Sequence, residues 1–504
     1  MFLGDTPPTQ KPKVCEKQPP NSSRIPFDIL QQIFEILPTD RATFDVTSDP
    51  WSVMRVCSFW RAAAEATPLL WTAIHFNTAL ISTRSAEGST SILRLVLSMT
   101  KNRPLDVNIR VTPLPPSQEL QFQAILDIIR DKGHRWRTLC FHPSSRSSDT
   151  WNILPFSPIS EYHALECVEL HNFSGFKWRR LLLALSEARS LRRLVLDPFN
   201  HLTVPPNPHP TLCWSQIVSL ELHAPLDIHA FSSIASECTH LCTLVVIDGA
   251  LRTTQSQVRD IKLRSLRNLE LCMRGSSVAT LSEWGLCPHL NVPNLQHLAL
   301  RNMHRDHIGD LIQVSNMLER SSCSITSLYI TGITAVDAKV QQLLQQPGFQ
   351  SVKKLELAGG LSSFLFDWLA REDHCLTELA RLDVDMAYGD GRIALTSPIG
   401  GIRRLLDARI TTLRVLNLRN VCLRTLLIED IQLVDEIRTL EGPSIAIFPY
   451  ALDDTLQKGL QPLRPEVRAI RELGEALGLL LTSTSWQVVM QSSRVRLTIP
   501  CLLK

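Results

Sequence analysis

A six-residue pattern, apolar-x-x-apolar-x-apolar, recurs through the middle of the chain and limits the folds open to it. Successive copies begin 24 to 34 residues apart, and a weaker copy begins at Trp136. Self-similarity at a period of about 20 to 50 residues is typical of proteins built from stacked structural repeats. The ten clear copies begin at Leu165, Leu191, Ile217, Leu241, Leu266, Leu295, Ile325, Val352, Leu379 and Leu413.

Each copy predicts a short strand followed by a helix. The fourth and sixth positions of the pattern lie on one face of a strand, because side chains alternate along it. Helix-like segments stand between the strands, at residues 178–190, 310–321, 336–346 and 362–371. No single unit can cover its own apolar faces, so we expect the units to stack in parallel around one continuous core. The expected fold class is an α/β repeat solenoid.

The pattern resembles the leucine-rich repeat over roughly residues 130 to 430, and this resemblance implies a horseshoe. The repeats are degenerate, since the Asn or Cys of the family is replaced by Phe173, Met303 and Val421. An ordinary doubly wound α/β domain is the alternative, because its strands also alternate with helices. Against it, no Gly-rich phosphate loop follows a strand, and ten units exceed the strand count of a typical open sheet.

Composition bounds the partners and the compartment. The chain has 504 residues, with 52 Lys and Arg against 49 Asp and Glu, which gives no reason to expect nucleic acid or a membrane surface as the main partner. The thirteen cysteines include no Cys-x-x-Cys pair and no zinc-type Cys/His spacing. We therefore expect reduced thiols and no bound metal or other cofactor. No apolar segment approaches the roughly 18 residues that span a bilayer, so we expect a protein of the cytoplasm, the nucleus or both.

The two ends of the sequence differ from its middle. Residues 1–23 are rich in Pro, Gln, Lys and Ser and lack the apolar core of a signal peptide, so they predict a disordered tail. The repeat fades after about residue 430. Residues 431–504 predict an irregular repeat or cap, with helices within 428–440 and 465–481 and a closing strand within 485–499.

Residues 24–76 predict a small helical module ahead of the repeats, which occupy residues 77–430. Pro26 suits the first turn of a helix. That helix carries an apolar stripe at three- and four-residue spacing, formed by Ile29, Leu30, Ile33, Phe34 and Leu37. A second helix, from Pro50 to Thr67, is expected to present one apolar face made of Val53, Val56, Cys57, Trp60 and Ala64. So small a module buries little area alone, so its apolar surface needs the first repeat or a partner protein.

Four segments of this module resemble, in order, the F-box. They are Ile25-Pro26-Phe27-Asp28-Ile29, Ile33-Phe34-Glu35-Ile36-Leu37, Val56-Cys57-Ser58-Phe59-Trp60-Arg61 and Pro68-Leu69-Leu70-Trp71. The departures are Ile25 for the usual Leu, Asp28 for Glu, and a longer linker before the Val-Cys segment. An F-box followed by leucine-rich repeats is similar to the F-box/leucine-rich-repeat substrate receptors, and to the large fungal families of F-box-like proteins.

The resemblance implies that the module docks on the Skp-type adaptor of a cullin–RING ubiquitin ligase. The receptor itself would not be an enzyme, because it only brings a substrate lysine near a ubiquitin thioester on another subunit. For each residue, a role inside the module's own core is the alternative to direct contact. The implied adaptor-binding residues are Ile25, Pro26, Ile29, Leu30, Ile33, Phe34, Leu37, Val56 and Trp60.

The repeats would then hold an unknown protein substrate on the strand-lined face. The outward-facing strand positions carry a mixture of acids and bases that suits a partner with a patterned charge surface. Val195 is also expected to face outward. The alternative is a solvated sheet face with local salt bridges, each of small value. A metal site at His142, His171 and His223 is not expected, because these residues lie a repeat apart with Asp197 intervening. The candidate substrate-binding residues are Glu169, Arg193, Glu221, Glu270, His297, Arg301, Tyr329, Lys354, Glu356, Arg381 and Asp383.

Two functions from different classes remain open. One is the substrate receptor of a Skp–cullin–F-box ubiquitin ligase. The other is a non-catalytic leucine-rich-repeat scaffold whose F-box-like segment is an N-terminal cap, or docks without ligase function. An enzyme is not expected, because the sequence has no nucleophile elbow, P-loop, zincin motif or dinucleotide fingerprint.

Overall fold

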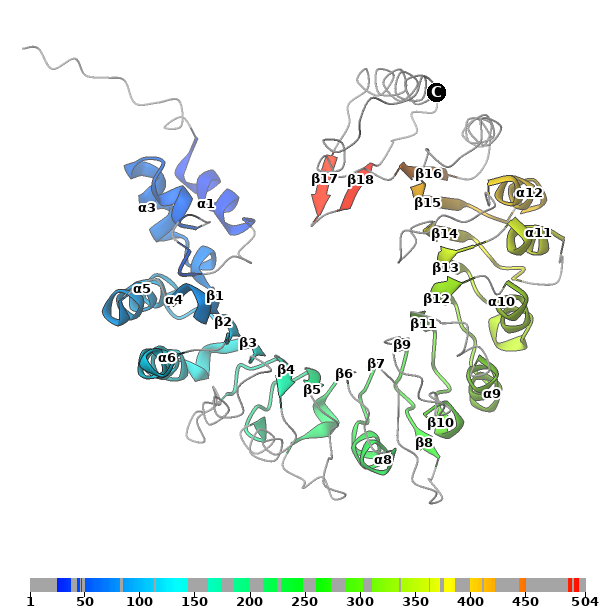
Figure 1. Cartoon of the computed structure of the whole chain (residues 1–504), viewed down its shortest axis with the longest axis horizontal. Coiled ribbons are helices and arrows are strands. Elements are labelled where there is room, and N and C mark those ends of the chain that lie inside the picture. Colours follow the sequence, from blue (N-terminus) through cyan, green and yellow to red (C-terminus); the bar gives the residue numbers. More distant parts are fainter. Residues whose placement is uncertain are drawn as a thin grey trace, which may run out of the picture. The chain divides into compact units, whose positions relative to one another are not determined.

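The chain falls into two compact units, Met1–Leu165 and Glu166–Lys504. The predicted tail at 1–23 and most of 431–504 lie outside the described residues. The computed structural model describes residues 25–37, 43–45, 47, 50–81, 85–112, 115–143, 162–173, 185–198, 212–223, 228–247, 260–272, 286–301, 311–334, 337–361, 363–371, 376–385, 399–409, 412–421, 444–449, 488–491 and 494–497 (Figure 1).

Unit 1 contains three parallel strands, β1 (Ala73–Asn77), β2 (Leu105–Arg110) and β3 (Trp136–His142). The helices α4 (Thr78–Ile81) and α5 (Ala86–Met99) lie between β1 and β2 in the chain. The helix α6 (Pro116–Arg130) and the short 3₁₀ helix η3 (Gly133–Arg135) precede β3. The alternation of strands and helices therefore begins before Trp136, where the first copy of the repeat starts. β2 does not match the repeat, because it buries alternate residues and lacks the spacing of the pattern.

The helical module of unit 1 consists of α1 (Phe27–Glu35), α2 (Trp51–Met54), α3 (Ser58–Ala66) and the 3₁₀ helix η2 (Pro68–Trp71). The expected single helix from Pro50 to Thr67 is wrong, because Cys57 is extended, with φ −163° and ψ 173°. The Arg61 Nε donates to the carbonyl oxygen of Met54 at 3.2 Å, where the helix ladder is broken. Val53 consequently stays buried while Val56 is turned to solvent.

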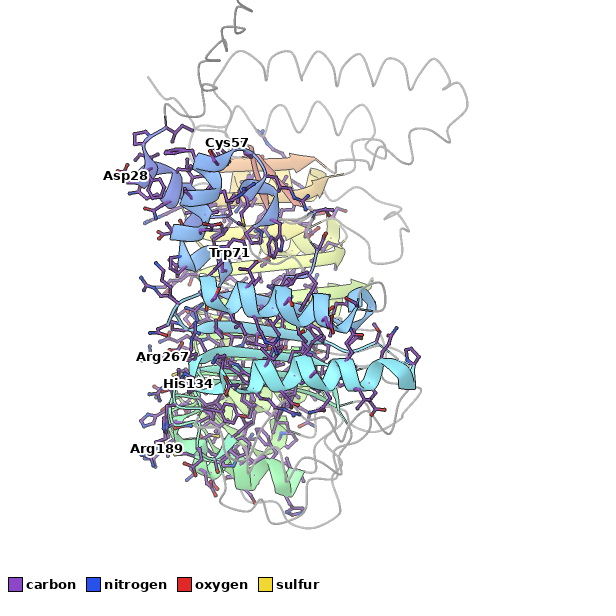
Figure 2. All side chains as sticks on the ribbon, turned by 90° about the vertical axis from the view of Figure 1, so that its left-hand side faces the viewer. Asp28, Cys57, Trp71, His134, Arg189 and Arg267 are labelled. Atoms are coloured by element: carbon purple, nitrogen blue, oxygen red, sulfur yellow. The ribbon has the colours of Figure 1, made fainter. Side chains whose placement is uncertain are left out.

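Two tryptophans join this module to β1. Trp71 is buried, and its Nε1 donates to the carbonyl oxygen of Ala64 at 2.8 Å. Its ring packs edge-on against Trp51, whose Nε1 donates to the carbonyl oxygen of Thr43. The N–H of Thr43 in turn donates to the carbonyl oxygen of His75 in β1 at 2.9 Å. Trp71 thus lies among the packed side chains of unit 1, whereas Asp28 lies at its outer edge (Figure 2).

Unit 2 is dominated by one parallel sheet, and the ten predicted strands are all present in it. Neighbouring strands pair in register, so equivalent positions of the pattern form rows across the sheet, as with Leu355 and Leu382. Two-residue strands β8 (Ile261–Lys262) and β10 (Leu290–Asn291) pair separately. The sheet order is β4 (Cys167–Phe173), β5 (Arg193–Pro198), β6 (Ser219–Leu222), β7 (Thr243–Ile247), β9 (Asn268–Cys272), β11 (His297–Arg301), β12 (Ser327–Thr334), β13 (Lys354–Gly360), β14 (Arg381–Asp385), β15 (Val415–Val421) and β16 (Ser444–Pro449).

The helices of unit 2 lie on one face of this sheet (Figure 1). A doubly wound domain has helices on both faces, so this alternative does not fit the described residues. The predicted helices at 310–321, 336–346 and 362–371 are confirmed, and the predicted helix at 178–190 lies mostly outside the described residues. The helices are α8 (Ile228–Glu237), α9 (Leu311–Ser321), α10 (Asp337–Leu344), α11 (Ser363–Arg371) and α12 (Ile399–Arg409), with 3₁₀ helices η6 (Trp214–Gln216), η7 (Cys287–His289) and η9 (Pro347–Phe349).

The C-terminal region departs from the sequence-based expectation in two places. β16 pairs in parallel with β15, so the sheet continues beyond residue 430. The expected single closing strand is instead an antiparallel pair, β17 (Val488–Gln491) and β18 (Arg494–Leu497). Among the described helices, none is both long enough and apolar enough to cross a lipid bilayer.

Candidate binding surfaces

The helix α1 places a row of isoleucines in solvent. Ile29 and Ile33 of α1 and Ile36, directly after it, are 42%, 38% and 81% exposed, and their spacing of four and three residues puts them on one side of the helix. Val56, 54% exposed, is a further solvent-facing apolar residue of the module. Exposed apolar residues that follow one another on a surface mark interaction sites more often than isolated ones do.

The structure divides the predicted adaptor-binding residues into two groups. Leu30 and Phe34 are fully buried in the module, so they stabilise it and offer no contact area to a partner. Trp60 is half-buried and packs edge-on against Phe34, with ring centroids 5.4 Å apart. The remaining residues are accessible to different degrees, with Pro26, Ile29, Ile33 and Val56 exposed and Ile25 and Leu37 half-buried.

The face of the unit 2 sheet opposite the helices carries the predicted substrate-binding residues, and all of them except His297 gather in three clusters. Helix-side positions such as Val168 and Leu170 are buried, whereas Glu169 between them is half-buried, as alternation along a strand requires. We call this the open face of the sheet. Each cluster joins side chains from adjacent strands.

The first cluster spans β4, β5 and β6. The Arg193 Nη2 lies 3.3 Å from a carboxylate oxygen of Glu169 and 3.7 Å from one of Glu221. Val195, expected to face outward, is only 2% exposed, because it stands between these two glutamates in the register and beneath their ion pairs. A hydrogen bond from His223 lowers the pKa of Glu221, and the positive charge of Arg193 acts in the same direction.

The second cluster spans β9, β11 and β12. The Arg301 guanidinium pairs with Glu270 and lies over the ring of Tyr329, 4.8 Å from its centroid. His297, at the start of β11, is exposed and stands apart from this group. An arginine held between a carboxylate and an aromatic ring presents a fixed, partly apolar contact surface.

The third cluster spans β13, β14 and β15 around Asp383. The Arg381 Nε lies 3.0 Å from a carboxylate oxygen of Asp383, and the Lys354 Nζ lies 3.7 Å from it. Arg419 pairs with Glu356 at 3.0 Å. Asp383, predicted to contact a substrate, is buried and offers almost no contact area to a partner. Its buried charge instead holds the half-buried bases Arg381 and Lys354 in place.

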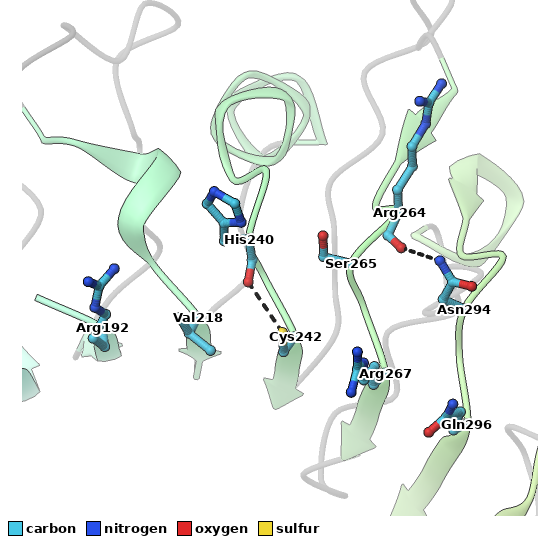
Figure 3. Close-up of a pocket in the computed structure, with 9 residues that line it drawn as sticks. All are labelled: Arg192, Val218, His240, Cys242, Arg264, Ser265, Arg267, Asn294 and Gln296. Atoms are coloured by element: carbon cyan, nitrogen blue, oxygen red, sulfur yellow. Dashed lines mark hydrogen bonds between the residues drawn. The ribbon is translucent and has the colours of Figure 1, made fainter.

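A polar pocket of about 650 Å³ lies at the amino-terminal ends of the unit 2 strands (Figure 3). Arg192 and Arg267 stand on either side of Val218 and Cys242 in it (Figure 3). No Asp or Glu is among its described lining residues, so its electrostatic potential favours an anionic group. We did not predict these residues from the sequence, although many of them occupy the variable position directly before a strand. The lining consists of Arg192, Val218, His240, Cys242, Arg264, Ser265, Arg267, Asn294 and Gln296.

Two buried thiols are poor candidates for chemistry. Burial raises the pKa of Cys238 to about 12 and that of Cys323 to about 11. Both side chains therefore stay protonated at neutral pH and behave as small apolar groups.

A comparison of the sequence with protein-family models and with curated proteins found no match to either.

Proposed function

We propose that this protein is the substrate-recognition subunit of a Skp–cullin–F-box type ubiquitin ligase. In this proposal the helical module docks on the Skp-type adaptor, and the repeats, stacked as a leucine-rich-repeat solenoid, bind a protein substrate. The chain would contribute no catalytic group, because the ligase's other subunits would transfer the ubiquitin.

The observation that most favours this function is the isoleucine row on α1. The buried residues Leu30 and Phe34 already complete the contact between α1 and the rest of the module. Within the described residues, the module therefore does not need Ile29, Ile33 and Ile36 in order to fold. Burying one such side chain contributes about 1.5–3 kcal/mol, so three of them supply a docking energy that a partner protein would realise.

The open face of the sheet supports the second half of the proposal. Its three clusters alternate acidic and basic groups over neighbouring strands and include the exposed Arg193 and the half-buried Lys354 and Arg381. Charges at such a rim select a partner and speed its association more than they strengthen the complex. The basic pocket at the strand ends would accept an acidic side chain of the same substrate.

The test of adaptor docking is co-purification of the full chain with a Skp-type adaptor. An Ile33→Asp variant should bind the adaptor at least tenfold more weakly. The variant loses the burial of one isoleucine, about 1.5–3 kcal/mol, and about 1.4 kcal/mol corresponds to a factor of ten in affinity. Its fold should be kept, since Ile33 is 38% exposed and lies outside the module's core.

Glu35→Lys is the control, because it also changes the charge at an exposed position of the same helix, two residues after Ile33 and therefore on another side of the helix. We expect this variant to bind the adaptor like the wild type. Failure of the folded wild-type chain to bind any Skp-type adaptor would reject the ligase function and favour a repeat scaffold without it.

A further inference from the structure

The polar pocket at the amino-terminal ends of the unit 2 strands contains two arginines at equivalent positions of the repeat. Arg192 directly precedes β5 and Arg267 directly precedes β9, with β6 and β7 between them in the sheet. Val218 and Cys242 occupy the same position before β6 and β7. These four residues follow one another along the strand ends, with an arginine at either end (Figure 3).

Backbone hydrogen bonds fix the spacing of this row. The N–H of Val218 donates to the carbonyl oxygen of Arg192 at 2.8 Å. The N–H groups of Cys242 and Arg267 continue the series, each to the residue before it in the row, at 2.8 and 2.9 Å. Neighbouring strands lie about 4.8 Å apart, so three steps place the two arginines about 14 Å apart. A ligand that contacts each guanidinium beside its own strand therefore needs two separated anionic groups.

The pocket carries positive charge without acidic partners. Its described lining residues include a third arginine, Arg264, and no Asp or Glu. Among the described residues, none of the three arginines forms a salt bridge. The Arg192 Nη1 donates to the carbonyl oxygen of Gln216 at 3.3 Å, and this neutral acceptor leaves the charge of Arg192 uncompensated. An anionic ligand would find all three charges available.

The rest of the lining favours a protein segment over a nucleic acid. No Phe, Tyr or Trp is among the described lining residues, so nucleic-acid bases have no aromatic side chain on which to stack. The wall is held in place by two hydrogen bonds of 2.7 Å, from the Asn294 amide to the carbonyl oxygen of Arg264 and from the Ser265 hydroxyl to that of Thr239. Such a fixed polar wall suits the backbone and side chains of an extended polypeptide.

We propose that this pocket binds an extended acidic segment of the protein substrate, with two Asp or Glu residues four positions apart. An extended strand rises about 3.4 Å per residue and points alternate side chains to the same side, so residues i and i+4 lie on one side about 14 Å apart. That separation matches the one between Arg192 and Arg267. The residue at i+2 then lies over the half-buried Val218 and Cys242 and is small and uncharged. This inference rests on the proposed function, because the segment belongs to the substrate that the repeats would hold.

The test is fluorescence anisotropy of short labelled peptides titrated with the full chain at low ionic strength, where charges are screened least. Two peptides share one composition of Gly, Ser, Thr and two Glu, with the glutamates at i and i+4 in one and at i and i+2 in the other. We expect the first to bind about fivefold more tightly, the factor that one further exposed ion pair supplies at most.

Charge reversal in the pocket checks which side chains set this preference. Arg267→Glu should remove the preference for the i, i+4 peptide and weaken its binding by about tenfold, because an attraction becomes a repulsion. Arg414→Glu is the matched control, since Arg414 is exposed at the same position before β15 and does not line the pocket. This control should bind the peptide like the wild type.

Equal binding of the two peptides by the wild type would overturn the inference, and this comparison needs no variant. Tighter binding of a short oligouridylate than of the i, i+4 peptide would also overturn it and assign the pocket to nucleic acid. Co-purification with the Skp-type adaptor is measured separately on the same protein. Loss of the peptide preference with adaptor binding intact would therefore reject this inference and leave the docking half of the proposed function standing.

Discussion

Replacement of Asp383 by Asn removes a buried charge from the third cluster while keeping the size of the side chain. The Asp383 side chain is 1% exposed, and its oxygens lie 3.0 Å from the Arg381 Nε and 3.7 Å from the Lys354 Nζ. Asn417 also donates its side-chain amide to Asp383. The asparagine offers only one oxygen and turns an amide toward the bases.

The expected loss of unfolding free energy is about 2–3 kcal/mol. Breaking a buried ion pair costs about 3–5 kcal/mol when the remaining partner stays buried and unpaired. Here Arg381 and Lys354 are 39% and 41% exposed, so both bases regain water once the carboxylate charge is gone. The cost therefore falls at or below the lower end of that range. It remains well above the roughly 0–1 kcal/mol of an exposed ion pair.

Urea unfolding and hydrogen exchange measure this difference. The matched control is Glu378→Gln, which removes an exposed carboxylate 3.5 Å from Lys353 in the same part of the sheet, with side chains 54% and 62% exposed. We expect the control to change stability by less than about 1 kcal/mol and the Asp383→Asn variant to lose protection in β13 to β15. Equal stability of the two variants would refute the idea that Asp383 holds this cluster together.

Three further predictions test packing and charge. Gly401→Ala should destabilise unit 2 by about 1–3 kcal/mol, because its Cβ would lie 2.6 Å from a backbone oxygen of α11. Gly400→Ala, one residue earlier and near only the flexible Arg404 side chain, should instead stabilise α12 by up to about 1 kcal/mol. Melting temperatures that shift in the same direction in both glycine variants would contradict this. Trp71→Phe should cost about 1–3 kcal/mol through the lost Nε1 hydrogen bond and ring volume, measured as faster hydrogen exchange in α3. His223→Ala should lower the melting temperature most above pH 4.5, the usual pKa of a glutamate, and progressively less in acid. The sign follows because a carboxyl with a lowered pKa stabilises the folded state only while it is ionised, so a difference that grows toward low pH would be inconsistent.

The strands of unit 2 were predictable because their signal repeats. Each copy places three apolar residues at the same spacing, so one weak strand is supported by nine others at similar intervals. β1 and β2 do not belong to this series of copies. They only bury alternate residues, such as Ile74 in β1 and Val107 in β2. The break at Cys57 was not predictable from periodicity, since Val53, Val56 and Trp60 also fit an unbroken helix. Its cause is local, in the extended backbone and in the Arg61 contact to Met54.

Burial on the open face was harder to predict than position, because it depends on side chains from neighbouring strands. Asp383 and Glu356 occupy paired positions in adjacent strands, yet Asp383 is fully buried and Glu356 is not. The difference arises from the bases that close over Asp383, the nearest of them Arg381 of its own strand. Pattern position places a residue in a row of the sheet, and the side chains around it, from its own strand and from neighbouring strands, decide whether water reaches it.

The same principle changes how the histidines are judged. A residue that intervenes between two others in the chain usually separates them. In a parallel sheet with in-register strands, the residue of the intervening repeat lies between them in space, as the pairing of His171 with Asp197 shows. Asp197 therefore links the two histidines across the sheet, 3.2 Å from the His171 Nδ1 and 3.6 Å from the His223 Nδ1.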